Sequence, residues 1–564
     1  METKVARADY RILALAVCVA LVGRFLVNLN YFALPFPQQD DFSNIVSWAN
    51  ALFTVDRKDV FKALTRLEAE HLQVFGRTIY LAVLWLNGTL NLRYIIIIGG
   101  LFWVGVAAVL GFYCLRAFED VRVRCLTVVL VTASLLHLQT YDSLAFASGA
   151  ANNLTYPLLL LAGILMSQAR SLGWFLASLF VGWLCFYTLA PGLFSLFGII
   201  AVQILKRSTA RAIAAVMFTL LACAVYVLSR DWSAVPAAGA HFSLTGAIHY
   251  VVLFIGSAAG NINIRAGLVL GAILIAFWSV IAVLAAGSRE FRSSLPPFPV
   301  GTALACFGVA GSAGLSRSLM GPAQAVSSRY AAISIILVIV TVLLVVSLLP
   351  PRWRLAFAAC CTAIAILFNL ATYPLYSPVL EAVRSTNLWN AKSFFAGRDD
   401  PSVLIPPEIS RNPRRDLETA FDLGLINRAI LKSSMESRAI VTGPVSLTDR
   451  NPRGNSAVGY LDFLSRLPDS VKLQGWVAIP KTDLLAADTQ LILDGEQASY
   501  TVPTLKIFRP DVAQAESQLV WCGFVAYIDP RIMPPGKYAV SARIRVGSRV
   551  EERNLGVVAE FPEK

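Results

Sequence analysis

Two adjacent carboxylates, Asp40 and Asp41, directly follow the first long apolar run of the chain. Such a pair can supply a general base that removes a proton from a sugar hydroxyl. It can also hold Mg²⁺ or Mn²⁺, which prefer oxygen ligands. The competing interpretation of the pair is a solvated start of a loop. We predict a catalytic role for Asp40 and Asp41 and leave the metal, Mg²⁺ or Mn²⁺, open.

A second ionisable group, Glu70, His71 and Arg77, lies at the far end of the same loop. Glu70 and His71 could complete a metal site or assist proton transfer, and Arg77 could contact a phosphate. The alternative is that these residues cap a helix at the membrane interface. The residues alone favour that alternative over metal ligation.

Arg317 and Arg329 lie near the two ends of residues 314–330, which are rich in glycine, alanine and serine. Small residues let a head group approach the backbone, and an arginine can pair with two phosphate oxygens at once. The pattern fits a polyprenyl phosphate or pyrophosphate bound by Arg329 and Arg317, with Arg77 as a further phosphate ligand. Snorkelling of these arginines to lipid head groups is the rival explanation.

A third predicted loop holds Asp142, Asn152 and Asn153, which could hydrogen-bond the hydroxyl groups of an acceptor sugar. The sequence contains no P-loop, dinucleotide fingerprint, nucleophile elbow or HExxH motif. A cytosolic nucleotide-driven enzyme is therefore disfavoured. Any chemistry must then use a substrate that is already at the outer face of the membrane, and a lipid-linked donor is such a substrate. Three isolated histidines are interpreted as structural: His137, His241 and His249.

The composition shows which kind of protein must position these residues. Of the 564 residues, 56% are hydrophobic and 15% are charged, and the mean hydropathy is +0.63. A soluble globular chain is about 45–50% apolar and about 25% charged. A soluble enzyme, a disordered chain and a disulfide scaffold are therefore excluded. Eight of the nine cysteines lie in apolar runs and are expected to behave as small hydrophobes.

The sequence predicts a polytopic α-helical membrane protein with about eleven spans. A hydrocarbon core of about 30 Å needs about 20 apolar residues of helix. Residues 172–205 allow either two short helices around Ala190-Pro191-Gly192 or one long broken helix. The predicted spans are residues 11–31, 94–115, 125–138, 154–169, 172–189, 191–205, 211–229, 265–286, 298–315, 331–349 and 355–374.

The net charge of +13 comes almost entirely from residues 1–374, which hold 25 basic and 13 acidic side chains. Lysine and arginine gather in the cytoplasmic loops of membrane proteins. With alternating spans, one set of connections holds 14 such residues, and the short loops of the other set hold four. The N-terminus is therefore predicted in the cytoplasm. An odd number of spans places the C-terminal region outside, in the periplasm of a Gram-negative cell.

The long first outer loop, residues 32–93, has apolar residues at helical spacing. This pattern predicts two amphipathic helices on the outer membrane surface. A re-entrant or interfacial helix is predicted at residues 78–92, which are apolar but too short to span. The loop would hold Asp40 and Asp41 close to the membrane surface.

We predict three domains: a transmembrane domain over residues 1–375, a mixed connector over 376–470 and an antiparallel β-sandwich over 471–564. The connector is proline-rich, with one helix predicted at 414–432. Hairpin turns are predicted at Asp494-Gly495 and Gly547-Ser548. The strand candidates are residues 471–479, 489–494, 497–503, 519–528, 537–546 and 549–558.

Three aromatic residues of this last region, Trp476, Trp521 and Tyr527, could stack on sugar rings. Burial inside the sandwich is the favoured interpretation of the same residues. The β-domain is therefore predicted to be an accessory that guides a glycan acceptor, without a catalytic cluster of its own.

This layout resembles the GT-C superfamily of integral-membrane glycosyltransferases. The shared features are the aspartate pair after the first span, amphipathic helices in a long first outer loop, many short-looped spans and a C-terminal periplasmic β-domain. Two short stretches, residues 70–77 (EHLQVFGR) and 328–330 (SRY), are similar to those of bacterial membrane proteins in that group. The resemblance covers about residues 1–375.

The resemblance implies that an outer-loop aspartate acts as base or metal ligand and that the donor is a polyprenyl-phosphate sugar. The first role passes to Asp40 or Asp41, and phosphate contact passes to Arg329 first and to Arg317 second. The chain departs from the group because its outer loops lack a second clear acidic motif. Metal dependence is therefore left open.

We expect a glycosyltransferase of the bacterial inner membrane that transfers a sugar from a polyprenyl-phosphate donor to a cell-envelope glycan or lipid acceptor at the periplasmic face. Its expected partners are that donor, the acceptor and membrane lipids, and no nucleic acid. One alternative is a polysaccharide polymerase or ligase that uses pyrophosphate-linked glycans. Another is a non-catalytic flippase or transporter of lipid-linked glycans. Transporters place ionisable residues at mid-membrane and often show internal repeats, whereas these spans hold almost no charge apart from Arg24.

Overall fold

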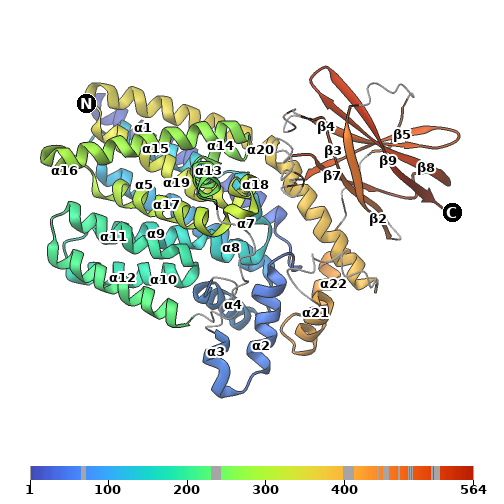
Figure 1. The fold of residues 1–564 in the computed structure, drawn as a ribbon, viewed down its shortest axis with the longest axis horizontal. Helices are drawn as coiled ribbons and strands as arrows, with labels where there is room; N and C mark the ends of the chain where they lie inside the picture. The colour runs from blue at the N-terminus through green and yellow to red at the C-terminus, as the bar shows by residue number, and fades with distance from the viewer. Residues whose placement is uncertain are drawn as a thin grey trace.

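The computed structural model is a bundle of long helices with two antiparallel β-sheets beyond one end (Figure 1). Glu70 and His241, singled out above, lie outside the described residues. The structure describes residues 2–64, 71–229, 243–397, 412–438, 440, 442, 444–448, 456–467, 470–480, 482, 484, 487–507, 509, 512 and 521–562.

Long apolar helices make up the bundle. Within the described residues, nine stretches are long and apolar enough to cross a membrane. Each of the eleven predicted spans falls on a helix, but two of those helices are shorter than the nine, so the number eleven stays a prediction. The bundle helices are α1 (Glu2–Phe32), α5 (Leu92–Ala117), α6 (Val121–Leu135), α9 (Thr155–Met166), α10 (Leu172–Thr188), α11 (Phe194–Leu205), α12 (Thr209–Ser229), α13 (Leu244–Ile255), α15 (Ile264–Gly287), α17 (Pro297–Arg317), α19 (Ser328–Leu348) and α20 (Pro351–Phe395).

Burial separates the central helices of the bundle from the peripheral ones. Two thirds of the apolar stretch of α19 is buried (67%), compared with 17% for α1 and for α12. Apolar side chains that the protein leaves uncovered on α1 and α12 suit contact with lipid tails. The intramembrane Arg24 of α1 lies over the ring of Tyr373 of α20, with 3.4 Å between the guanidinium carbon and the ring centre.

Residues 172–205 form two helices, α10 and α11, and not one broken helix. Leu189 is extended between them, and a short 3-10 turn, η4 (Ala190–Leu193), begins the second. At Gly192 a Cβ atom would lie 2.1 Å from the backbone oxygen of Cys185. Only glycine permits this close approach of the turn to α10.

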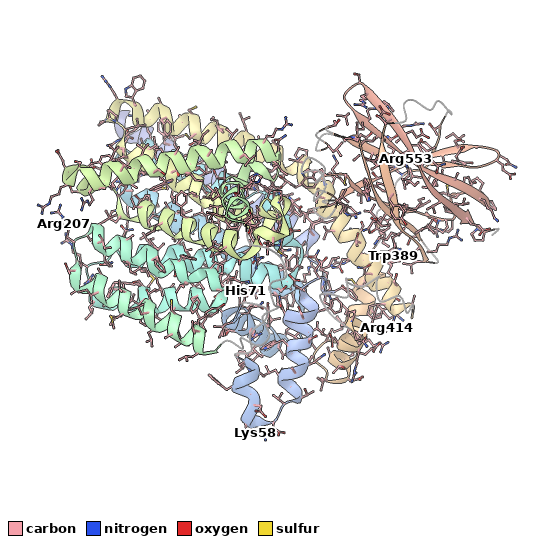
Figure 2. The ribbon with its side chains drawn as sticks, in the orientation of Figure 1. Lys58, His71, Arg207, Trp389, Arg414 and Arg553 are labelled. Atoms are coloured by element: carbon pink, nitrogen blue, oxygen red, sulfur yellow. The ribbon has the colours of Figure 1, made fainter. Side chains whose placement is uncertain are left out.

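The last bundle helix, α20, continues past the predicted end of its span at residue 374 and through Pro374 and Pro378. Each proline removes one backbone hydrogen bond and favours a kink. The helix nevertheless continues, and buried side chains such as Tyr376 and Trp389 pack along it. Its C-terminal half reaches the β-sheets (Figure 1), and Trp389 lies at that junction (Figure 2). Arg207 lies at the opposite end of the bundle (Figure 2).

Short helices cover the end of the bundle that faces the sheets. The two amphipathic helices predicted in the first loop correspond to η1 with α2 and to α3, and the predicted interfacial helix to α4. The single helix predicted at 414–432 is wrong, because Gly424 (φ +69°) ends α21 and a second helix follows. The short elements are η1 (Phe42–Ser47), α2 (Trp48–Thr54), η2 (Arg57–Asp59), α3 (Val60–Leu64), α4 (Val74–Asn87), η3 (Leu138–Thr140), α7 (Tyr141–Ala145), α8 (Ala147–Asn153), α14 (Ser257–Gly260), η6 (Ser318–Met320), α18 (Pro322–Ala325), α21 (Pro413–Asp422) and α22 (Arg428–Glu436), with α16 (Arg289–Ser294) between α15 and α17.

The C-terminal region forms two antiparallel sheets with strand orders β1-β5-β4-β8-β9 and β2-β3-β7-β6. Val546 pairs with Arg549, so Gly547-Ser548 is a two-residue turn as predicted. The other predicted turn is longer, because Asp494 pairs with Ser499. The strands are β1 (Ser446–Leu447), β2 (Val458–Leu467), β3 (Ser470–Ala478), β4 (Asp488–Asp494), β5 (Ser499–Pro503), β6 (Leu505–Ile507), β7 (Gly523–Ile528), β8 (Gly536–Val546) and β9 (Arg549–Phe561).

Buried aromatic residues join the sheets to the bundle. The indole N–H of Trp521 donates to the backbone oxygen of Asn261 (3.2 Å). The centre of the Trp521 ring lies 6.4 Å from the ring centre of Tyr141 and 6.3 Å from that of Tyr376. Trp521 and Tyr527 are buried, so neither ring is open for stacking on a sugar. Burial was the favoured interpretation, but Trp521 is buried against the helical bundle and not between the sheets.

Replacing Trp521 by alanine is expected to lower the unfolding free energy by about 3–5 kcal/mol, because a large buried ring and its packing are lost. Thermal unfolding of the detergent-solubilised chain, followed by fluorescence, measures the change. Tyr460→Ala serves as the control, because Tyr460 is 59% exposed on β2. Equal losses for the two variants would show that Trp521 is not a junction residue.

Candidate functional site

A cavity of about 930 Å³ lies at the end of the bundle nearest the sheets, and it collects most of the predicted site residues. Its polar wall comes from the first loop, α8, and the region between α17 and α19. Its apolar wall comes from the ends of bundle helices. The polar lining is Asp40, Ser43, Asn44, His71, Gln73, Ser148, Asn152, Asn153, Ser312, Ser316, Arg317, Gln324, Arg329 and Tyr330. The larger apolar and aromatic lining residues are Phe146, Tyr156, Phe186, Leu189, Leu193, Phe194, Tyr226, Phe254, Val309 and Met320.

The turn between α1 and η1 places Asp40 on the cavity wall. Pro35 and Pro37 follow the end of α1, where a proline cannot continue the helical hydrogen bonds. Gln39 then adopts a left-handed backbone conformation (φ +47°), and the backbone N–H of Asp41 donates to the oxygen of Gln38 (2.9 Å). The tight turn directs the two neighbouring carboxylates to different environments.

Asp41 is buried and does not line the cavity. Its carboxylate accepts the backbone N–H groups of Ser148 (2.6 Å), Ala147 (3.2 Å) and Gln38 (3.3 Å). Two of these donors belong to the first turn of α8, where helical N–H groups lack partners within the helix. Burial nevertheless raises the pKa of Asp41 to about 7. Asp41 therefore holds α8 against the loop and is not placed to touch a substrate.

The raised pKa of Asp41 predicts a pH-dependent stability. In the unfolded chain the group titrates near pH 3.8, so between about pH 4 and 7 the folded protein keeps a proton that the unfolded chain has released. The contribution of Asp41 to stability then falls as pH rises through this window, by roughly 4 kcal/mol in all, and is constant above about pH 8. Melting temperatures of the wild type relative to Asp41→Asn should fall from pH 5 to pH 8. A pH-independent difference would contradict the assignment.

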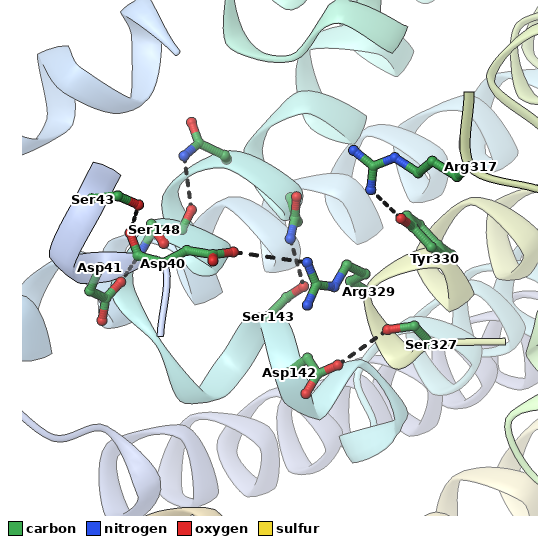
Figure 3. Close-up of polar contacts among 12 residues, drawn as sticks. Asp40, Asp41, Ser43, Asp142, Ser143, Ser148, Arg317, Ser327, Arg329 and Tyr330 are labelled. Atoms are coloured by element: carbon green, nitrogen blue, oxygen red, sulfur yellow. Dashed lines mark hydrogen bonds and ion pairs between the residues drawn. The ribbon is translucent and has the colours of Figure 1, made fainter. Parts of the chain in front are cut away.

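Asp40 and Arg329 face each other in the cavity (Figure 3). Arg329 Nη1 lies 3.9 Å from Asp40 Oδ2, and the side chains are 28% and 37% exposed. Arg329 lies in the first turn of α19, and its Nε is buried without a hydrogen-bond partner among the described residues. The loose ion pair leaves both groups able to contact a ligand.

Arg317, the last residue of α17, adds a second guanidinium to the cavity. It donates to the hydroxyl of Tyr330 and lies over that ring, with 5.8 Å between the guanidinium carbon and the ring centre. Tyr330 packs against Phe254 of α13, with ring centres 5.0 Å apart. The aromatic contacts fix the direction of Arg317 beside Arg329.

His71, Asn152 and Asn153 also line the cavity. The Nδ1 of His71 accepts the backbone N–H of Ala190 (3.3 Å), which places its proton on Nε2. Asn152 is held by several hydrogen bonds, including a donation to the hydroxyl of Tyr80 (3.2 Å). These side chains supply fixed polar groups on the wall that Asp40 shares.

Three predicted site residues within the described part of the chain do not line the cavity: Asp41, Arg77 and Asp142. Arg77 is buried, donates to the backbone oxygen of Leu64 (2.9 Å) and lies over the ring of Trp48. Asp142 accepts the hydroxyl of Ser327 (3.3 Å) at the start of α19 (Figure 3). We interpret Arg77 as part of the loop core and Asp142 as a support for the turn that holds Arg329.

The described residues show no preformed cluster of ligands for Mg²⁺ or Mn²⁺. No group of three or more His, Cys, Asp or Glu side chains gathers within the part of the chain that the structure describes. Both oxygens of Asp41 accept backbone N–H groups, and the carboxylate of Asp40 faces a cation, Arg329. Mg²⁺ can be held by one or two carboxylates together with substrate phosphates, so the dependence on Mg²⁺ or Mn²⁺ stays a prediction.

Sequence reasoning missed the apolar wall of the cavity and the role of Ser148. Phe186, Tyr226 and Phe254 lie on three different helices, and nothing in their local spacing separates a cavity residue from a lipid-facing one. Ser148 follows no motif, yet its N–H binds Asp41. The tyrosine after Arg329 was a usable signal, because it belongs to the quoted stretch at residues 328–330.

Comparisons with known proteins found no match: no protein-family model, curated protein or solved structure is similar to the chain.

Proposed function

We propose that this chain is a glycosyltransferase of the GT-C type, acting at the outer face of a bacterial inner membrane. It would transfer a sugar from a polyprenyl-phosphate donor to a cell-envelope glycan or lipid acceptor. The observation that carries the proposal is the cavity in which a carboxylate, Asp40, faces two arginines, Arg329 and Arg317, beside an apolar wall. Such a site offers one base, two phosphate ligands and a surface for a hydrocarbon chain.

The loose contact between Asp40 and Arg329 supports an exchange of partners on donor binding. Oxygens of the donor phosphate are better ligands for Arg329 than a carboxylate 3.9 Å away, because an arginine can bind two phosphate oxygens at once. The unpartnered Nε of Arg329 supplies a further donor. Donor binding would therefore release Asp40 to act as a base.

The transfer step then follows from the residues in place. Asp40 accepts the proton of the acceptor hydroxyl while the oxygen of that hydroxyl forms a bond to the anomeric carbon of the donor sugar. The bond between that carbon and the phosphate oxygen breaks, and its electron pair leaves with the lipid phosphate. Arg329 and Arg317 hold the charge of the leaving phosphate, which is the kind of preorganised stabilisation that accelerates group transfer.

The arrangement of elements supports an outer location for the site. His71, which lines the cavity, lies well away from Arg207, a basic residue of a predicted cytoplasmic connection (Figure 2). In this proposal the two sheets form a periplasmic β-sandwich, and the eleven predicted spans set the N-terminus in the cytoplasm.

A pyrophosphate-linked glycan is the second candidate donor, which would make the chain a polysaccharide polymerase or ligase. The presence of two arginines, Arg317 and Arg329, in one cavity favours this candidate. Both arginines can bind one phosphate, but a pyrophosphate offers each of them a phosphate group of its own.

The decisive experiment reconstitutes the full chain in proteoliposomes with a labelled polyprenyl-phosphate sugar and, separately, a polyprenyl-pyrophosphate glycan. Glycan and lipid extracts of a bacterial envelope supply the acceptors. Transfer from the monophosphate alone supports the first proposal, and transfer from the pyrophosphate alone supports the second. Absence of transfer from both donors would count against a glycosyltransferase.

A further inference from the structure

A second cationic cluster lies outside the cavity, at the C-terminal end of α1. It contains Arg93 from the first turn of α5, Arg384 from the C-terminal half of α20 and Arg438 just after α22. Arg93 Nη2 donates to the side chain of Asn30 (2.8 Å). The guanidinium carbon of Arg384 lies 4.6 Å from the ring centre of Tyr31. Arg93 and Arg384 are therefore held by successive residues of α1.

The cluster has more positive charge than its surroundings neutralise. Glu381 pairs with Arg384 at 2.9 Å, and no other ion pair to these three arginines is found among the described residues. Arg438 follows α22, which packs against α20, and burial together with the charges of Arg93 and Arg384 lowers the pKa of Arg438. Like charges this close are unfavourable unless an anion accompanies them.

Two guanidinium nitrogens of the cluster are buried without a partner. The Nε atoms of Arg93 and Arg384 make no hydrogen bond among the described residues, and Arg384 is only 9% exposed. A buried donor without an acceptor is costly, and more so when it is charged. An anionic oxygen bound at the cluster would satisfy these donors.

We propose that Arg93, Arg384 and Arg438 bind a phosphate group, supplied by the head group of an anionic membrane lipid. The position favours the lipid, because Tyr31 and Tyr94 are 49% and 46% exposed beside the cluster. Tyrosines are enriched where helix ends meet the water–lipid boundary. The inference rests on the membrane position of α1 and α5 and does not depend on the proposed glycosyl transfer.

Native mass spectrometry of the full chain, released from nanodiscs of equal phosphatidylglycerol and phosphatidylcholine, tests the site. The wild type is expected to retain phosphatidylglycerol preferentially, and Arg93→Gln/Arg438→Gln should reduce that preference roughly tenfold. Arg384 is left in place because of its pair with Glu381. The matched control, Arg415→Gln/Arg553→Gln, removes two exposed arginines and should leave the preference unchanged.

Inorganic phosphate is the second probe, because a soluble phosphate has the same chemistry as the head group. Phosphate could raise the melting temperature of the wild type but not that of Arg93→Gln/Arg438→Gln, while the wild type shows no lipid preference. That result would support an anion site but reject the lipid as the source of the phosphate. Equal lipid retention in all three proteins with no effect of phosphate would overturn the proposal.

Discussion

Replacing Asp40 by asparagine is expected to slow sugar transfer by about 10²–10⁴-fold, the usual contribution of a general base. Asparagine has the size of aspartate but cannot accept the proton of the acceptor hydroxyl. Asp40 is partly exposed on the cavity wall, so the change should leave the fold intact. Initial rates in proteoliposomes with saturating donor measure the effect, and the melting temperature checks the fold.

The neighbouring carboxylates provide the controls for this prediction. Asp56→Asn changes a carboxylate of the same loop whose side chain is 78% exposed, and it should leave the rate unchanged. Asp41→Asn removes part of the support of α8 and should alter stability more than the rate of the properly folded fraction. Normal transfer by Asp40→Asn, or equal losses for Asp40→Asn and Asp56→Asn, would refute the assigned base.

The second large effect is expected at Arg329. Arg329→Gln removes both a phosphate ligand and the charge that stabilises the leaving phosphate, so kcat/KM for the donor should fall about 10²–10³-fold. Arg329→Lys keeps the charge but cannot bind two oxygens in one plane. It should therefore recover only part of the activity. Steady-state kinetics at varied donor concentration separates the effect on KM from that on kcat.

A matched control for Arg329 is available at the other end of the bundle. Arg352 is an exposed arginine at the start of α20, and Arg352→Gln should leave donor kinetics unchanged. If the Arg329→Gln and Arg352→Gln variants had the same kcat and KM for the donor, the arginines of the cavity would act only as lipid-facing anchors. That result would favour the snorkelling explanation.

The fold was largely predictable because its signals are local. Apolar runs locate the helices, and β-rich runs with glycine turns locate most strands. The misses have physical causes. Helix α20 continues through Pro374 and Pro378 because its C-terminal half is packed against other elements. Helix α21 ends at Gly424, whose left-handed conformation a helical pattern does not reveal.

Some residues of the cavity were named from the sequence, but their placement was not predictable. Asp40 and Asp41 are indistinguishable in sequence. Only the left-handed turn at Gln39 sends one carboxylate to the cavity and the other to the first turn of α8. Arg77 has the residue type of a phosphate ligand, but its burial against Trp48 depends on packing between segments distant in the chain.

The contact between the donor phosphate and Arg329 is best tested by a cryo-electron microscopy structure of the full chain with a non-hydrolysable polyprenyl-phosphonate sugar. Density for the phosphonate within hydrogen-bond distance of Arg329 and Arg317, with the sugar beside Asp40 and the lipid chain along Phe186 and Phe254, is the expected result. A phosphonate bound elsewhere, with Asp40 and Arg329 still paired, would contradict the assignment of this cavity.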